Sequence, residues 1–377
     1  MRTRLVTGIS FMAATALLLA GCSSGTTESV TSESAAPAET AETTVSEPSL
    51  AFVGPNGEIP GGLDELLLSN EESAEVSALG LTAVFVWHTS GDFTSAVEAG
   101  AREQFEALGI KVLASTQANF DAATQADNVA SVLALDPDIV VAIAVDPTSA
   151  ASSFQQIVDD GRILVIMTTP PAGYRAGQEF VSIVTADLAL AGKYNAELLI
   201  DAMGNSGEVV YMYHDADFWF TNQRDQAFKN WLGYLAPDIN IVEEAGFTDE
   251  ARTQEIAAAL LTKNPNITGF YVPWATAAQG VLAAVRDAGR DEIKIVTNDL
   301  DTILAANMYA GGNVVGISAP NAFGIGIGLA IAAAYGALGK PAPELVASEP
   351  IKVTADNLAD AWKADLGVDA PANVFGK

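Results

Sequence analysis

Two histidines, His88 and His214, are the side chains of this chain best suited to acid–base chemistry. Each follows a run of apolar, β-type residues, so each is expected in a loop, where a histidine can act as a general base. The sequence has no nucleophile elbow, no P-loop and no spaced cluster of metal ligands beside them. Asp217 lies near His214, but isolated His–Asp pairs are common. We therefore predict no enzyme activity, no cofactor and no metal site.

The same loops combine aromatic rings with charged groups, which suits binding rather than catalysis. Rings and carboxylates alternate in Trp87–Phe93 and in His214–Phe220, and Arg224, Trp274 and Asp299 follow later strands. Aromatic rings stack on the apolar C–H faces of sugars, aspartate accepts hydroxyl protons, and arginine donates in a fixed fork. A few charged groups can orient hydroxyls without requiring a charged ligand. The expected ligand is a small neutral sugar or polyol.

Cys22, the only cysteine, ends a second chemically meaningful pattern. It follows Arg2, Arg4, an apolar run and a pair of small residues, which is typical of a secretory signal. The pattern resembles the bacterial lipobox, whose cysteine carries a diacylglycerol. The resemblance implies that residues 1–22 are a lipoprotein signal peptide. Cys22 would then anchor the chain in the lipid bilayer at the outer face of the cytoplasmic membrane. A plain signal peptide or an N-terminal membrane helix is the alternative.

Residues 23–79 are acidic and contain no lysine or arginine. Residues 23–48 consist almost only of Ser, Thr, Ala, Glu, Pro and Gly. Such a composition cannot bury enough apolar surface to order itself, so we predict a disordered tether over 23–79. Within it, residues 50–79 leave an alternative open, because turn signals precede a stretch at 64–79 that could form a short helix packed on the body.

The overall composition excludes some partners. A net charge of −29 argues against nucleic acid, whose phosphates need basic partners, and against charge-driven docking on an anionic membrane. Beyond the leader and tether about 300 residues remain, more than one compact core usually holds, which favours two domains. The apolar run 323–338 is shorter than the ~20 residues of a membrane span and contains recurring glycines, so a buried helix is expected there.

From Leu81 onward, apolar strand-like runs alternate with helical stretches. Most of the runs are continuously apolar, which is typical of parallel strands covered by helices on both faces. Repeated strand–helix units of ~30 residues predict an α/β fold with doubly wound parallel sheets. The strands are expected at 83–87, 111–114, 139–144, 163–167, 180–184, 208–213, 239–243, 269–272, 293–297 and 314–318. The helices are expected at 94–107, 122–134, 148–160, 187–202, 221–234, 250–262, 275–288, 302–309 and 322–338.

Five segments, taken in chain order, resemble one protein family. They are Phe93–Ala101, Asp136–Thr148, Asn222–Phe228, Asn264–Phe270 and Ile295–Asp299. Together they resemble the ribose-type periplasmic sugar-binding proteins, from about Leu81 to about Trp362. The resemblance implies a type I binding protein of an ABC importer, in which two lobes close on a ligand and dock on a permease. We expect a monomer.

The same resemblance implies three hinge crossings, near Thr185, Ser318 and Pro350. The N-terminal lobe would comprise 80–185 plus 319–349, and the C-terminal lobe 186–318 plus 350–366. Loops at the carboxyl ends of the strands should face the ligand. The predicted ligand contacts are His88, Ser90, Asp92, Phe93, Asp146, Thr169, Asp217, Phe218, Trp219, Asn222, Arg224, Phe247, Trp274, Asn298, Asp299 and Ser318.

Four of these contacts are implied by position in the family: Arg224 and Asp299 as polar contacts, Phe247 as a stacking ring, and Phe93 as a first-lobe aromatic. Each of the first three has an ordinary structural alternative. Arg224 could be a surface helix residue, Asp299 a helix N-cap before Ile303, and Phe247 part of the core.

The sequence also departs from the family pattern. The family's Asp-Arg pair is replaced by Thr169-Pro170, an asparagine by Trp274, and a glutamine by Ser318 or Ala319. Several contacts to a pentose are thereby lost, so we expect a sugar or linear polyol other than ribose. A ligand-presenting sensor for a chemoreceptor or a sensor kinase is the alternative function, since the same fold serves that role.

Overall fold

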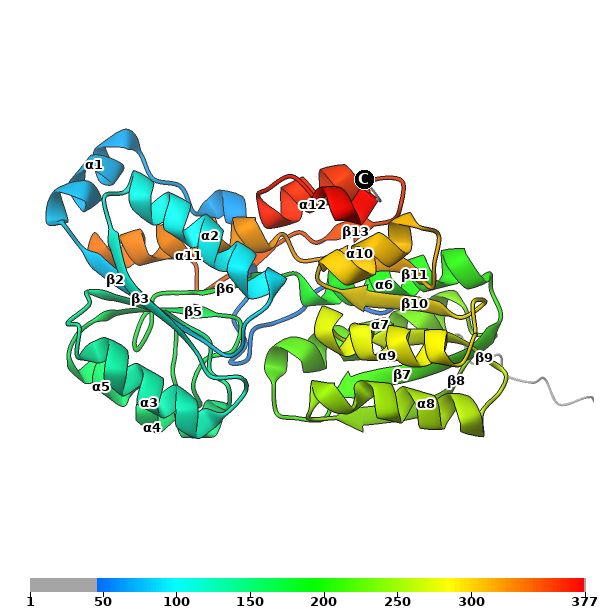
Figure 1. The fold of residues 1–377 in the computed structure, drawn as a ribbon. Coiled ribbons are helices and arrows are strands. Elements are labelled where there is room, and N and C mark those ends of the chain that lie inside the picture. The colour runs from blue at the N-terminus through cyan, green and yellow to red at the C-terminus, as the bar shows by residue number, and fades with distance from the viewer. Residues whose placement is uncertain (1–45, 376–377) are drawn as a thin grey trace, which may run out of the picture. The chain divides into compact units, whose positions relative to one another are not determined.

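Alternating strands and helices form two α/β lobes, each built on one sheet (Figure 1). The computed structural model describes residues 46–375. The predicted lipidation site Cys22, the signal peptide and the first part of the predicted tether lie outside this range. The expected fold class, two doubly wound parallel-sheet lobes, is confirmed.

The first lobe contains a seven-stranded parallel sheet. β4 and β6 are buried along their whole length, because helices cover both faces of the sheet. In spatial order the strands are β1 (Pro60–Gly62), β12 (Leu345–Ser348), β6 (Ile183–Ala186), β5 (Ile163–Met167), β4 (Ile139–Ala142), β2 (Thr82–Trp87) and β3 (Lys111–Gln117). The helices are α2 (Asp92–Ala107) and α11 (Ala322–Ala337) on one face, and α3 (Ala122–Leu133), α4 (Pro147–Ser153) and α5 (Gln155–Asp159) on the other (Figure 1).

The second lobe contains a six-stranded sheet that is parallel except for its edge strand β13. In spatial order the strands are β13 (Ile351–Val353), β11 (Val314–Ala319), β10 (Lys294–Asn298), β9 (Ile267–Val272), β7 (Gly207–His214) and β8 (Ile239–Phe247). The helices are α6 (Leu188–Met203) packed on α7 (Trp219–Leu235), α8 (Thr253–Lys263) packed on α9 (Ala275–Asp287), and α10 (Thr302–Tyr309).

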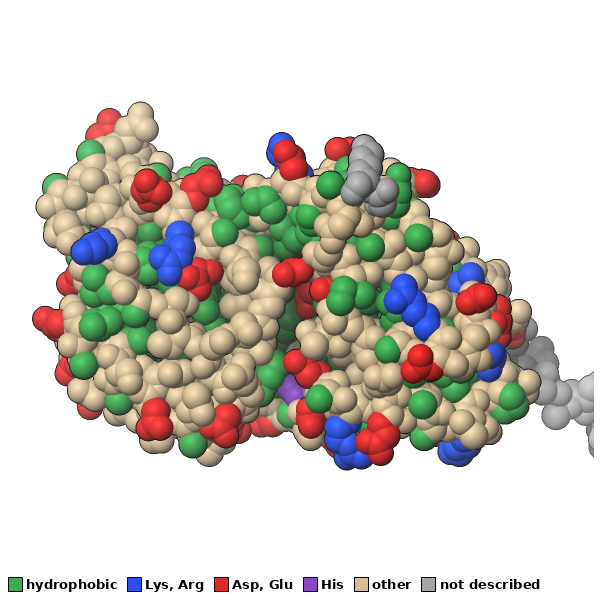
Figure 2. Space-filling model, viewed as in Figure 1, with side chains coloured by type: hydrophobic (Ala, Val, Ile, Leu, Met, Phe, Trp, Pro, Cys, Tyr) green, Lys and Arg blue, Asp and Glu red, His purple; other side chains and the backbone are tan. Residues whose placement is uncertain are grey.

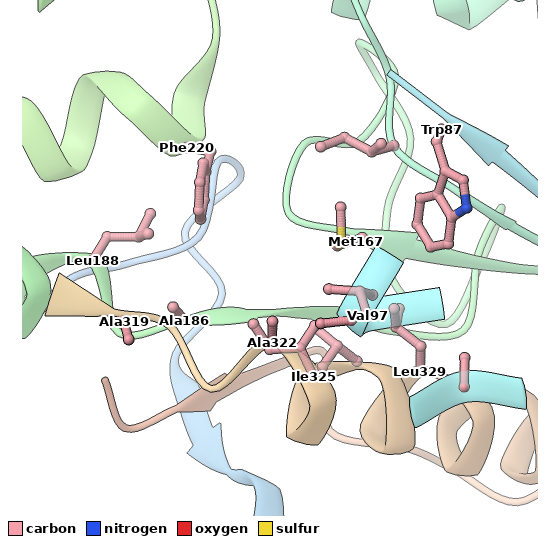
Figure 3. Close-up of a cluster of buried hydrophobic side chains, with 14 of the residues drawn as sticks. Trp87, Val97, Met167, Ala186, Leu188, Phe220, Ala319, Ala322, Ile325 and Leu329 are labelled. Carbon is pink, nitrogen blue, oxygen red and sulfur yellow. The ribbon is translucent and has the colours of Figure 1, made fainter. Parts of the chain in front are cut away.

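Three connections join the two sheets, between β6 and α6, between β11 and α11, and between β12 and β13. Buried apolar side chains fill the junction around them, among them Ala186, Leu188, Ala319 and Ile325 (Figure 3). The C-terminal helix α12 (Leu358–Leu366) and the short η3 (Ala372–Phe375) follow β13. The resemblance places 350–366 wholly in the C-terminal lobe, but α12 also packs against α2 and α11. The helix therefore bridges both lobes.

The prediction of a disordered tether is wrong for residues 46–79, where Phe52 is already buried, and the alternative of a short helix within 64–79 packed on the body is the one observed. β1 adds to the sheet beside β12, η1 (Leu63–Glu65) follows, and α1 (Asn70–Leu79) starts at a capping box made by Ser69 and Glu72. Leu66 and Val76 are fully buried. The prediction failed because it relied on the acidic composition of the whole segment and overlooked these apolar positions. It also could not anticipate β12, the partner strand of β1, which lies near the other end of the chain.

Close packing of α2 on α11 explains the glycines of the apolar run 323–338. A Cβ added at Gly326 would lie 2.0 Å from the carbonyl oxygen of Val97, and one at Gly100 would lie 2.1 Å from that of Phe323. The two helix backbones therefore touch, and only glycine fits. The run forms the buried helix that was expected. Within residues 46–375, no helix combines the length and the apolar content that crossing a membrane requires.

Candidate ligand-binding cleft

A cavity of about 200 Å³ lies between the lobes, where loops at the carboxyl ends of strands from both sheets meet. The first lobe supplies residues 88–94, which form the loop after β2 and the start of α2, together with Phe120. The second lobe supplies His214, parts of α7 and α9, and residues 299–301. The space-filling view shows this hollow between the lobes, with acidic side chains and a histidine at its mouth (Figure 2). This is where open α/β sheets bind their ligands.

Aromatic rings line the cavity and contact one another across it. Phe93 of the first lobe stacks near Phe220 of the second at 6.5 Å between ring centroids. Phe120 lies 6.1 Å from Phe218 and 6.2 Å from Trp274. The lobes are thus in contact through rings, whose faces offer an apolar surface to the C–H groups of a ligand.

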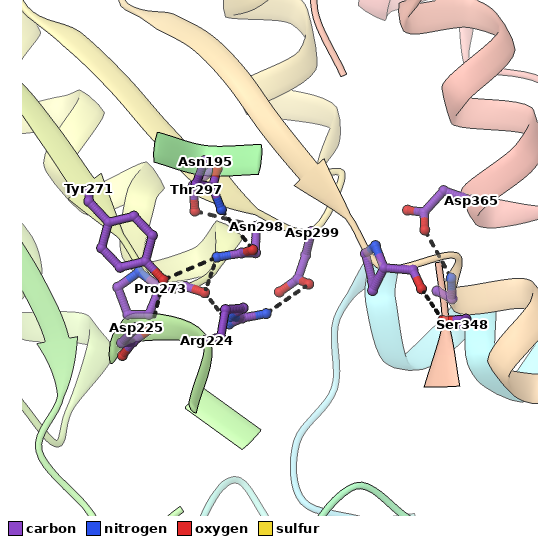
Figure 4. A network of polar contacts seen from close by, with 12 residues as sticks. Asn195, Arg224, Asp225, Tyr271, Pro273, Thr297, Asn298, Asp299, Ser348 and Asp365 are labelled. Atoms are coloured by element: carbon purple, nitrogen blue, oxygen red, sulfur yellow. Dashed lines mark hydrogen bonds and ion pairs between the residues drawn. The ribbon is translucent and has the colours of Figure 1, made fainter. Parts of the chain in front are cut away.

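Arg224 lies in the second turn of α7 and is 2% exposed (Figure 4). Its guanidinium is 4.8 Å from the centre of the Phe220 ring, its Nη2 donates to the Pro273 carbonyl, and its Nη1 is 3.8 Å from Asp299 Oδ1. Nε is buried without a hydrogen-bond partner among the described residues. A buried donor without a partner costs about 1–3 kcal/mol, so this nitrogen favours a ligand acceptor.

Asp299 follows β10 with a left-handed backbone, φ 68°, which is uncommon outside glycine. It is 8% exposed, and its Oδ1 has no hydrogen-bond partner among the described residues. Burial raises the pKa of Asp299 to about 6, an effect that Arg224 opposes. The N-cap of α10 is Asp301, which accepts from the amides of Ile303 and Leu304. The capping alternative for Asp299 is therefore wrong, and its carboxylate faces the cavity.

A layer of buried polar groups behind the cavity holds its walls (Figure 4). Asn298 Nδ2 donates to the Pro273 carbonyl at 3.1 Å, and its side-chain oxygen accepts from Asn195 at 2.9 Å. The Tyr271 hydroxyl donates to Asp225 Oδ1 at 2.7 Å. Burial raises the pKa of Asp225 to about 6. These groups fix the loop that carries Trp274 and the helix that carries Arg224.

Both histidines line the cavity in the neutral form. Burial lowers the pKa of His88 to about 3, with His214 as a second cause, and burial lowers the pKa of His214 to about 4. His214 Nδ1 lies 3.1 Å from the Thr221 hydroxyl. Neutral imidazoles offer one donor and one acceptor each, which suits hydroxyl groups.

The structure brings part of the predicted contact set together and leaves the rest elsewhere. The cavity lining includes His88, Ser90, Asp92, Phe93, Phe218, Arg224, Trp274 and Asp299. The others do not line it: Asp146, Thr169, Asp217, Trp219, Asn222, Phe247, Asn298 and Ser318.

Local structure explains most of these differences. Asp146 caps α4 by accepting from the Ser149 amide, Asn222 donates to the Ala216 carbonyl, and Asp217 is exposed. Trp219 turns away to contact Phe52. Thr169 and Ser318 are buried and do not reach the cavity.

Phe247 occupies a second layer. Its ring is buried 4.9 Å from that of Trp274, so it supports Trp274 instead of stacking on a ligand. The core alternative for Phe247 is thus the observed one, whereas the surface alternative for Arg224 is wrong.

The cavity lining also contains residues that the predicted contact set leaves out, among them His214, Phe220, Phe120, Glu250, Gln279 and Asp301. Phe120 follows β3, and the rule on strand ends would have found it had the strand been predicted to reach Gln117. Glu250 accepts from Trp274 Nε1, and Gln279 Nε2 donates to Asp301 Oδ2 at 2.8 Å. Glu250 begins a short 3-10 helix, Gln279 lies within α9 and Asp301 caps α10, and no sequence pattern marked them as lining residues.

The chain was compared with protein families, curated proteins and solved structures. The chain matches the model of the periplasmic binding protein domain over residues 82–341. No curated protein matches it. Three similar solved structures are ABC transporter or carbohydrate transporter solute-binding proteins, and at this level of identity they share the fold.

The first of these, from Agrobacterium vitis and bound with α-D-tagatopyranose, is 22% identical, covers 77% of this chain and 100% of its own, and has a TM-score of 0.69. One from Mycobacterium smegmatis with bound glycerol is 21% identical, covers 77% and 98%, and has a TM-score of 0.67. One from Agrobacterium radiobacter in complex with D-arabinose is 20% identical, covers 76% and 98%, and has a TM-score of 0.66. The family match spans most of both lobes and both walls of the cleft, and the chain belongs to the periplasmic binding protein family.

Proposed function

We propose that this protein is the extracytoplasmic solute-binding lipoprotein of an ABC importer. It binds a small sugar or polyol other than ribose in the cleft between its lobes and delivers it to a membrane permease. The observation that carries the proposal is that two buried atoms in the cleft have no hydrogen bond among the described residues. Arg224 Nε and Asp299 Oδ1 are a buried donor and acceptor, set among aromatic rings.

The ligand class follows from the chemistry of the lining. The rings of Phe93, Phe120 and Trp274 suit apolar C–H faces, while Arg224 and Asp299 suit hydroxyl groups. The volume of about 200 Å³ lies below the roughly 300–1,000 Å³ of sites for drug-sized ligands, so a monosaccharide or short polyol fits. The similar structures contain tagatopyranose, glycerol and arabinose, which are of this class.

Binding couples to lobe closure. Phe93 and Phe120 come from the first lobe, whereas Arg224, Trp274 and Asp299 come from the second, so only the closed form offers all of them at once. A ligand that contacts both lobes stabilises that form, and the three crossings act as the hinge. No bond of the ligand is made or broken.

Retention at the membrane is assigned to Cys22. Two acyl chains on that cysteine give stable attachment, since each buried methylene contributes ~0.8 kcal/mol. Residues 23–45 serve as an acidic, solvated spacer that leaves the cleft free to meet the permease. The closed, ligand-bound form docks on the permease subunits.

A calorimetric titration tests the proposal. Pentoses, hexoses and linear polyols are titrated into the protein, with Arg224→Ala as the variant and Asn222→Ala as a matched control on the same helix. At least one compound is expected to bind with a Kd of about 1 μM or below, about 8 kcal/mol. The control is expected to keep that affinity and the variant to lose it. Ribose as the tightest ligand, or no binding by correctly folded protein across the panel, would refute the proposal.

A further inference from the structure

The segment 46–59, here called the strap, contacts both lobes and lies outside the three connections between the sheets. At its C-terminal end the chain enters β1, which pairs with β12 in the first lobe. At its N-terminal end it lies against α6 and α7 of the second lobe. Figure 1 shows this blue segment passing between the two lobes. The strap is therefore a fourth link across the cleft junction.

The second-lobe attachment centres on Phe52. Its side chain is 7% exposed, and its ring lies 6.1 Å from that of Trp219. Residues 48–53 share a groove with Ala189 of α6 and with Gln223, Ala227 and Trp231 of α7. An aromatic side chain buried to this degree stabilises its seat by roughly 1.5–3 kcal/mol. By contrast, the neighbouring Val53 is 56% exposed.

The first-lobe attachment is a tight turn at Gly54–Glu58. The Gly54 amide donates to the Glu58 carbonyl at 2.7 Å, and the Glu58 carboxylate accepts from the backbone and side-chain nitrogens of Asn56 at 2.8 and 2.9 Å. Asn56 Nδ2 also donates to the Tyr174 carbonyl at 3.1 Å, and Arg175 donates to Asn56 Oδ1. These hydrogen bonds hold residues 54–58 in the turn, so the chain between Phe52 and β1 cannot extend while they persist.

The seat of Phe52 adjoins the cleft. Trp219 is the first residue of α7, and its neighbours Phe218 and Phe220 both line the cavity. Phe220 in turn carries the Arg224 guanidinium over its ring. The strap therefore packs on the start of α7, the same segment whose Phe218 and Phe220 line the cavity.

We propose that the strap limits opening of the lobes and that Phe52 is a positioning residue, acting through Trp219 on the start of α7. This inference rests on the proposed function for its ligand-binding part. Opening the cleft moves α7 away from the first lobe, and a strap without slack resists that motion until Phe52 leaves its seat. The strap thereby raises the population of the closed, binding-competent form.

Two perturbations of the full chain test this. Phe52→Ala removes the aromatic side chain that packs on Trp219, and Val53→Ala, at the next residue, is the matched control. An insertion of Gly-Ser-Gly-Ser after Val53 keeps both attachments but adds slack. Small-angle scattering measures the radius of gyration without ligand. Stopped-flow fluorescence measures kon and koff with D-tagatose, D-arabinose and glycerol as probes.

Phe52→Ala and the insertion are both expected to increase the ligand-free radius of gyration. They are also expected to raise the apparent Kd about fivefold, because apparent affinity falls with the population of the competent form. The rise should appear mainly in koff, which a general loss of folded protein would not change. Val53→Ala should stay within about twofold of the parent, as exposed substitutions do.

An unchanged radius and koff in folded Phe52→Ala would overturn the proposal. Should Phe52→Ala fail to fold, the insertion decides, and an unchanged radius there overturns it equally. Should none of the three probes bind, the tightest ligand of the calorimetric panel replaces them, and the scattering comparison tests the strap independently of any ligand.

Discussion

Replacing Asp299 with asparagine should stabilise the fold at neutral pH while weakening ligand binding. Burial raises the pKa of this carboxyl from 3.8 to about 6. The folded state therefore binds the proton more tightly than the unfolded state does, and stability falls as the pH rises from about 4 through about 6. A shift of this size corresponds to about 3 kcal/mol across the whole window.

Asparagine has no charge to bury, so Asp299→Asn removes this penalty. Part of the gain is offset, because Arg224 Nη1 loses the carboxylate at 3.8 Å. The net difference in free energy of unfolding, variant minus parent, should therefore be small below pH 4 and reach about 1–3 kcal/mol at pH 8. Binding should change in the opposite direction, since a hydrogen bond to a charged group is worth about 1.5–3 kcal/mol, or about tenfold to a hundredfold in Kd.

Urea denaturation between pH 4 and pH 8 measures the first quantity, and calorimetry at pH 7 measures the second. The raised pKa of Asp225 is common to the parent protein and the variant. The Asp299 charge is one cause of the raised pKa of Asp365, so the difference also contains the relief of that repulsion, which adds to the gain in stability at pH 8. The reasoning would be refuted by a variant that is less stable than the parent at pH 8, or by one that binds as tightly.

Three further predictions follow from the site and the hinge. Trp274→Ala should weaken binding about tenfold or more, about 1.4 kcal/mol, because it removes a ring of the lining, and an unchanged Kd by calorimetry would contradict the assignment. Asp146→Ala should lower the free energy of unfolding by about 1 kcal/mol, because it removes the cap of α4, and it should leave the Kd unchanged. A raised Kd would show that Asp146 contributes to ligand binding. Asp365→Asn should raise the melting temperature at pH 8.5 but not at pH 4. Burial raises the pKa of Asp365 to about 7, so its stabilising contribution is lost as the pH rises through that value, and equal differences at both pH values would exclude this account.

The elements of the fold were predictable because their signals are local. Continuous apolar runs such as Ile139–Ala142 and Ile163–Met167 became fully or largely buried parallel strands, and the helical stretches between them appeared within a few residues of the expected bounds. The resemblance predicted three crossings between the lobes, and the chain passes from one sheet to the other after β6, β11 and β12. By contrast, β1 could not be expected, because its pairing partner β12 lies nearly three hundred residues later.

The site was predictable in its chemistry but only partly in its membership. The rule that ligands meet the carboxyl ends of parallel strands identified His88, Phe93 and Arg224 as lining residues. It could not tell which side chains of a loop turn inward. Asp299 and Asp301 are two residues apart, and the backbone conformation at Asp299 decides that Asp301 caps α10 while Asp299 faces the cavity.

The sequence by itself determined the α/β architecture, the family and the mixture of rings, carboxylates and one arginine that suits the proposed ligand. These depend on residue type and on spacing along the chain. Only the tertiary structure decided that Phe120 lines the cleft, that Trp219 faces away from it, and that Phe52 is seated on Trp219. Such contacts join residues far apart in the chain, and their geometry depends on how two separately folded sheets meet.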